Sequence, residues 1–158
     1  MKAQVTGQIF IYIMVIVVVG LIVLIGYTYI GKILEAKCNA DRVKFVKQIE
    51  EYAEKYDGYN EVGTERISAP CDTDIVCFVD SQAVADGIDL DIADPVIKNS
   101  AEVGVETNIF LVGEETEGVG YSRKIKVADP YYICIAKTGN FLNVRFSGDS
   151  EYSTITTY

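Results

Sequence analysis

Hydrophobic and polar positions divide the chain into three parts, of which the first is almost purely apolar. The segment "QIFIYIMVIVVVGLIVLIGYTYIG", residues 8–31, has no charged side chain, and uncharged sequence runs from Ala3 to Gly31. About 20 apolar residues cross the hydrocarbon core of a bilayer, so this run is long enough to span one. Because lipid offers the backbone no hydrogen-bond partners, the run is predicted to be a helix despite its many Val and Ile residues.

The second part, "KILEAKCNADRVKFVKQIEEYAEKYDGY", has the period of an amphipathic helix. Its predicted apolar stripe consists of Val43, Val46, Ile49, Ala53 and Tyr56. One helix is therefore expected from the apolar run to about Tyr56. At 1.5 Å per residue it would be about 75 Å long, more than a bilayer can cover.

The third part is rich in short β-branched and aromatic segments separated by Gly, Pro, Asp and Asn, which predicts strands. The predicted strands are "TERISAP", "DIVCFVD", "TNIFLVG", "YSRKIKVAD", "YYICIAK", "FLNVRFSG" and "EYSTITTY". We expect "KTGN" and "SGDSE" to be hairpin turns, and the acidic insertion at residues 81–106 to hold a short helix or two.

The predicted fold class is therefore α+β, with a long N-terminal hydrophobic and amphipathic helix before an antiparallel, sandwich-like β-rich head. The expected parts are three residues at 1–3 before the helix, an apolar, transmembrane helix at 4–37, a helical extension at 38–58 and a β-rich head at 59–158. A cleaved secretory signal is a competing interpretation of the apolar run. Such signals have apolar regions of about 7 to 15 residues and a small-residue cleavage site, which "IGKILEAKC" does not offer.

Charge makes nucleic acid an unlikely kind of partner. The chain has 14 basic and 23 acidic residues, and residues 1–37 hold only three lysines and one glutamate. The head therefore carries nearly all of the negative charge, which repels a phosphate backbone. The acids concentrate in residues 57–117, whereas residues 118–158 have more cations than acids. This unevenness indicates either a solvated acidic face or complementary patches on neighbouring copies.

Four cysteines, all on one side of the apolar run, favour an oxidising compartment and two disulfides. They are Cys38, Cys71, Cys77 and Cys134. Cys77 and Cys134 lie in predicted core strands that can be neighbours, which leaves Cys38 for Cys71. Free buried thiols and a zinc site are the alternatives, but the spacings lack C-x2-C pairs and the chain has no histidine.

No residue pattern indicates an enzyme, a cofactor or a metal. Without histidine there is no Ser-His-Asp or Cys-His system, and no P-loop or nucleophile-elbow motif occurs. Catalysis by carboxylates alone stays open, because acidic residues are abundant and nothing singles out a pair. The aspartates of the insertion, Asp86, Asp89, Asp91 and Asp94, lack the EF-hand order, so we interpret them as an acidic surface loop.

The order of these parts resembles the type IV pilin superfamily, particularly archaeal pilin-like proteins. Precursors in that superfamily carry a short charged leader that is cut just before the apolar helix. The stretch "KAQV" is similar to such a site, with Ala3 before the cut and Gln4 after it; "TGQI", between Gly7 and Gln8, is a second candidate. Many pilins have glutamate at the fifth mature position, where this chain has Gln8 when counted from Gln4.

The resemblance implies a structural subunit of an extracellular filament, anchored in the membrane before assembly and joined afterwards to copies of itself. A prepilin-type peptidase and an assembly machinery are the further partners that it implies. The helices of neighbouring copies would pack at Ile11, Val15, Val18, Gly20, Ile22 and Gly26. The alternative is a single-span membrane protein with an extracellular binding module, in which the helix stays in lipid.

Overall fold

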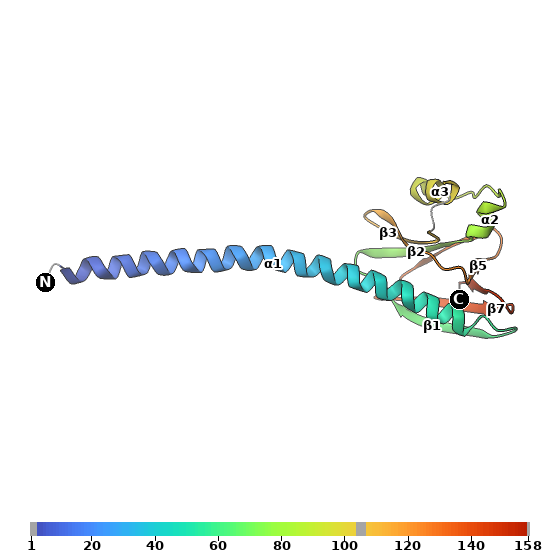
Figure 1. The fold of residues 1–158 in the computed structure, drawn as a ribbon, viewed down its shortest axis with the longest axis horizontal. Coiled ribbons are helices and arrows are strands. Elements are labelled where there is room, and N and C mark those ends of the chain that lie inside the picture. The colour runs from blue at the N-terminus through green and yellow to red at the C-terminus, as the bar shows by residue number, and fades with distance from the viewer. Residues whose placement is uncertain (1–2, 104–106, 158) are drawn as a thin grey trace. The chain divides into compact units, whose positions relative to one another are not determined.

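The structure, a computed structural model, describes residues 3–103 and 107–157. It confirms the α+β fold: a long N-terminal helix, α1 (Ala3–Lys55), precedes a β-rich head whose strands are mostly antiparallel (Figure 1). The chain divides into two compact units, Met1–Asn39 and Ala40–Tyr158. Residues 1–2 of the expected leader lie outside the described residues.

In the first unit, the described residues belong to α1 alone. The helix satisfies its backbone internally, and it also satisfies a side chain: the Thr28 hydroxyl donates a hydrogen bond of 2.8 Å to the carbonyl oxygen of Ile25. A hydroxyl that is hydrogen-bonded to its own helix adds little free-energy cost when the helix enters apolar surroundings. This part of α1 is therefore compatible with lipid or with tightly packed protein around it.

Two four-stranded sheets form the head in the second unit. The first sheet has the order β1-β7-β8-β5, from β1 (Val62–Ser68), β7 (Phe141–Gly148), β8 (Ser153–Thr156) and β5 (Ile125–Val127). The second has the order β4-β3-β2-β6, from β4 (Thr116–Gly120), β3 (Ile109–Gly113), β2 (Thr73–Val79) and β6 (Tyr132–Ala136). Neighbouring strands are antiparallel except β5 and β8, which are parallel.

The main core combines both sheets with the last turns of α1. Phe45, Ile49 and Ala53 of the helix are buried in one cluster with apolar side chains from seven strands. On β7 the alternation is complete, since Leu142, Val144 and Phe146 point inward between exposed neighbours. The helix thus replaces the solvent that would otherwise reach the inner faces of the two sheets.

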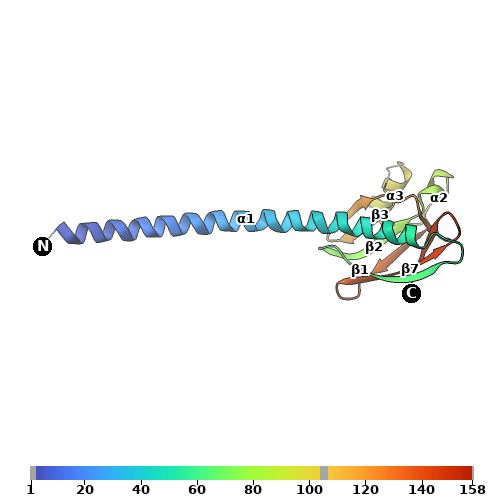
Figure 2. The ribbon, with the colours of Figure 1, turned by 60° about the horizontal axis from the view of Figure 1, so that its bottom comes forward.

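A second, smaller cluster covers the other face of the β2/β3 sheet. Two short helices, α2 (Ser81–Ala85) and α3 (Pro95–Glu102), lie on the side of this sheet away from α1, and the two views agree on this (Figures 1 and 2). Val79 and Phe110 are buried there with Leu90 and Ile97. Because its sheet is covered on both faces, β2 is an almost continuous apolar run.

The structure corrects three details of the sequence interpretation. Phe45, 1% exposed, occupies the buried stripe of α1, and Val43 is 60% exposed; two residues turn a helix by about 200°, so the two cannot share a face. The strand β4 was not predicted, because "TEGVG" has two glycines and no alternation of apolar residues. "KTGN" does form a turn, but β6 and β7 enter different sheets instead of pairing as a hairpin.

Candidate functional site

The candidate functional site is the exposed apolar surface of α1. Every large apolar side chain from Ile9 to Leu34 is at least half exposed, from 50% for Val18 to 82% for Tyr27. The segment is long and apolar enough to cross a membrane, with a mean hydropathy of 3.2 over its best window. Such a surface is far larger than the apolar patches that water-soluble monomers leave uncovered.

The predicted packing residues lie within this surface, and the described part of the chain does not cover them. Ile11, Val15, Val18 and Ile22 follow one another at intervals of four and three residues, which aligns them on one side of the helix. Gly26 extends this stripe, whereas Gly20 lies on the opposite side. A methyl group added at either glycine would meet no other atom within 4 Å. Their packing against other copies stays a prediction.

All four cysteines are oxidised. Cys77 on β2 and Cys134 on β6 face each other across the antiparallel pair and form a disulfide of 2.01 Å, as the neighbouring-strand argument expects. Cys38 and Cys71 are disulfide-bonded too, and none of the four is free. Zinc binding by these thiols and the alternative of free buried thiols are therefore excluded, because no thiolate is left. Two disulfides are consistent with an extracellular location.

The end of α1 is fixed to the first sheet by a polar cluster that the sequence analysis did not single out. The Tyr56 hydroxyl donates a 2.6 Å hydrogen bond to Glu65 on β1, and the Lys55 ammonium lies 2.9 Å from the same carboxylate oxygen. These two partners lower the pKa of Glu65, and the Tyr56 hydroxyl and Glu65 together raise the pKa of Lys55. In the sequence, Lys55 and Glu65 stand 10 residues apart. Their opposite charges were the only signal of this cluster, and nothing local indicated that they would meet.

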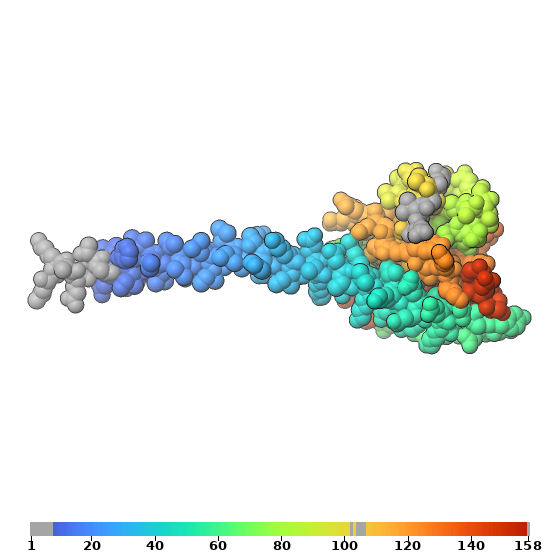
Figure 3. All heavy atoms as spheres, in the orientation of Figure 1, coloured from blue at the N-terminus to red at the C-terminus, as the bar shows by residue number. Residues whose placement is uncertain are grey.

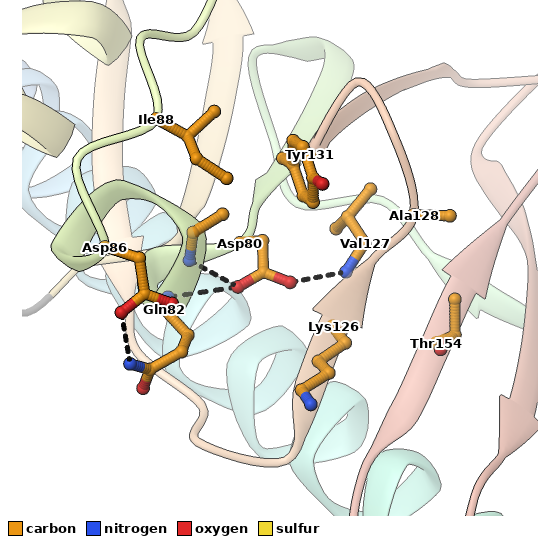
Figure 4. Close-up of a pocket in the computed structure, with 10 residues that line it drawn as sticks. Asp80, Gln82, Asp86, Ile88, Lys126, Val127, Ala128, Tyr131 and Thr154 are labelled. Atoms are coloured by element: carbon orange, nitrogen blue, oxygen red, sulfur yellow. Dashed lines mark hydrogen bonds between the residues drawn. The ribbon is translucent and has the colours of Figure 1, made fainter.

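One hollow in the head, of about 340 Å³, is lined in part by a buried aspartate (Figure 4). One Asp80 carboxylate oxygen accepts hydrogen bonds from the backbone amides of Gln82 and Ala83, and the other accepts one from Val127. By accepting from these three amides, the carboxylate links the start of α2 to β5. Asp80 therefore acts as a structural cap at the start of α2.

The insertion aspartates are largely engaged within the head. Asp94 caps α3 through the amides of Val96 and Ile97, and its second oxygen accepts a 2.6 Å hydrogen bond from the Thr116 hydroxyl, which lowers its pKa. Asp89 is 3.1 Å from the Lys98 ammonium. These partners fit the interpretation of a surface loop, and they do not converge on one position as calcium ligands would.

Comparisons with family models, with curated proteins and with solved structures find no match to this chain. Its function is therefore argued from the surfaces described above.

Proposed function

We propose that this chain is the structural subunit of an extracellular filament similar to a type IV pilus. In this proposal the apolar part of α1 anchors each copy in the membrane before assembly and packs against other copies afterwards. The acidic β-rich head stays in water. A prepilin-type peptidase would remove the leader after Ala3 or Gly7, and an assembly machinery would extract the subunits from lipid.

The observation that carries the proposal is the exposure of every large apolar side chain from Ile9 to Leu34. Each such side chain gains about 1.5 to 3 kcal/mol when it leaves water, so the segment must be surrounded by lipid or by other helices. Lipid and a neighbouring helix are about equally apolar. Assembly would therefore depend on side-chain packing, on contacts between heads and on the work of the machinery.

The continuity of α1 favours the filament over a plain anchor. The helix that exposes this apolar surface also supplies Phe45, Ile49 and Ala53 to the core of the head. A single-span protein needs only a tether between its anchor and its head. A subunit that transmits the order of a helical bundle to its heads needs one unbroken secondary-structure element.

The second candidate is a single-span membrane protein with an extracellular binding module. The hydropathy of α1 favours it, because a segment with a mean of 3.2 is readily stable in a bilayer as one helix. In that case the apolar surface would remain in lipid throughout the life of the protein.

Electron microscopy of the native particle tests the proposal. We expect helical fibres with a dense centre made of α1 and a rim made of heads. A protein that is extracted by detergent as a monomer and never forms fibres would contradict it. N-terminal sequencing of the mature protein separates the candidates further: Gln4 or Gln8 as the first residue supports filament processing, and Met1 supports the anchor.

A further inference from the structure

The outer face of the first sheet is an uncovered surface with an unusual composition for so acidic a chain. Strands β1, β7, β8 and β5 alternate, so every second residue points away from the core. We define the basic face by the outward residues Thr64, Arg66, Asn143 and Arg145 of β1 and β7. None of the outward residues of these strands is a carboxylate, although the chain has 23 acidic residues and a net charge of −9.

The cations of this face are not neutralised within the described residues. Arg66 and Arg145 are exposed, and no carboxylate among the described residues lies within ion-pair distance of either. Arg66 lies over the ring of Phe141, 3.9 Å from its centroid. Stacking on an aromatic ring holds a cation in place without removing its charge.

The opposite side of the head is acidic. The short helices α2 and α3 cover the second sheet, and in the space-filling view they form a lobe, coloured yellow-green to yellow (Figure 3). We define the acidic cap by Asp86, Asp89, Asp91, Asp94, Glu114 and Glu115. Lys98 is the only cation among residues 80–120. The hydrogen bond from Thr116 to Asp94 joins the β3–β4 turn to the start of α3.

The head is thus electrically polar across its layers. In order, these are the basic face, the first sheet, the main core with α1, the second sheet and the acidic cap. A single copy cannot bring its own Arg66 and Arg145 to the cap, because two sheets and the core separate them. The carboxylates of the cap can therefore meet these arginines only when they belong to another copy.

We propose that the basic face of one head docks on the acidic cap of a second copy. This inference rests on the proposed function, because it assigns the head contacts of the filament. The contact is heterologous, because one copy contributes its basic face and the other its acidic cap. Each copy keeps one free surface for the next copy, so the contact can repeat along a filament. Both heads are negatively charged, but their repulsion is largely screened beyond about 8 Å at physiological ionic strength. An arginine and a carboxylate in contact are much closer than that, so their attraction is screened less.

Cross-linking in the native assembly of the full chain tests the docking directly. The variant Arg66→Lys/Arg145→Lys keeps the charge and supplies amines, which a carbodiimide couples to nearby carboxylates. When copies of two nitrogen isotopes are mixed, we expect isotopically mixed cross-links from positions 66 and 145 to Asp91, Glu114 or Glu115. Cross-links from these positions to other regions, or none in an assembled sample, would overturn the docking.

Charge reversal gives an independent measurement with matched controls. Arg66→Glu/Arg145→Glu is expected to raise the protein concentration needed for assembly about tenfold or more, since like charges would meet at the interface. Arg123→Glu/Lys47→Glu makes the same change in net charge at two exposed positions outside both surfaces, neither of which is ion-paired among the described residues, and should assemble nearly as the unmodified chain does. Equal loss in both variants would contradict the docking.

A complementary reversal separates surface pairing from misfolding. The variant Asp91→Lys/Glu114→Lys should also assemble poorly alone, and mixing it with Arg66→Glu/Arg145→Glu should restore assembly with alternating copies. Failure of the mixture, with both variants retaining the Cys77–Cys134 disulfide, would count against the docking. Filaments without these cross-links would contradict the docking but not the filament proposal. Membrane-held copies that cross-link as expected but form no fibres would contradict the filament proposal but not the docking.

Discussion

The two halves of α1 are the same kind of helix but have opposite relations to the rest of the chain. From Ile9 to Leu34 the large apolar side chains are exposed on every side. From Phe45 to Tyr56 only one stripe is apolar and buried, and the other faces carry charge. The described residues therefore provide a core for the second half and none for the first, whose apolar side chains need lipid or other helices around them.

The largest expected effect is a loss of head stability after a substitution in the buried half of α1. Phe45→Ala should destabilise the head by about 4 kcal/mol, because a fully buried aromatic side chain leaves a cavity among both sheets. Ile16→Ala, in the exposed half, should leave the free energy of unfolding of the head almost unchanged. Chemical denaturation followed by the near-ultraviolet signal of the tyrosines measures both. A comparable loss for Ile16→Ala would mean that the first half also belongs to a core.

The next effect concerns the exposed half. Val18→Lys places a charge near the middle of the apolar run, at a cost of about 3 kcal/mol for a position inside a membrane. We expect less protein in the membrane fraction after an alkaline wash, and fewer or no fibres. Melting of the head should not change.

Val43→Lys is the matched control, because this valine is also well exposed but lies in the second unit. Its membrane fraction should equal that of the unmodified chain. If both variants were released equally, the apolar run would not be the anchor.

A smaller effect tests how closely the end of α1 approaches the first sheet. A side chain at Gly63 on β1 would collide with the ring of Tyr56, so Gly63→Ala should destabilise the head by about 2 kcal/mol. Gly20→Ala meets no atom within 4 Å and should instead raise helix stability by up to about 1 kcal/mol. Thermal unfolding of the two variants measures the contrast. A tolerated Gly63→Ala would show that the Tyr56 ring can move aside.

The smallest effect is a dependence on pH. The folded-state pKa of Glu65 is lowered by Tyr56 and Lys55, so its contribution is present above the unfolded pKa and disappears as pH falls through the folded pKa. Glu65→Gln should therefore flatten the acid side of the stability profile and leave its slope at neutral pH unchanged. Melting temperatures between pH 2 and pH 7, a range that brackets ordinary carboxyl titration, measure this. An unchanged acid slope would mean that Glu65 is not a major contributor.

Much of the fold could be predicted because its signals are local. The apolar run, the helix after it and the alternation of "FLNVRF" each depend on a few adjacent residues, and all were found where expected, except that Phe45 replaces Val43 in the buried stripe of the helix. The pairing of Cys77 with Cys134 also followed, because both lie in continuous apolar strands. The glycine-rich β4 and the divergence of β6 from β7 escaped prediction, since sheet partners rather than local sequence decide them.

The amino-acid sequence by itself determined that the first part of α1 needs an apolar environment, because no charge interrupts residues 3–31 and no fold can change that composition. It also determined that the head is acidic, and it favoured two disulfides, which the structure confirmed. Only the tertiary structure decided that Phe45 rather than Val43 enters the core, and that the cations of β1 and β7 share one uncovered face on the side opposite the acidic cap. Residues such as Arg66 and Arg145 become neighbours only through strand pairing, so their common surface exists only once the chain has folded.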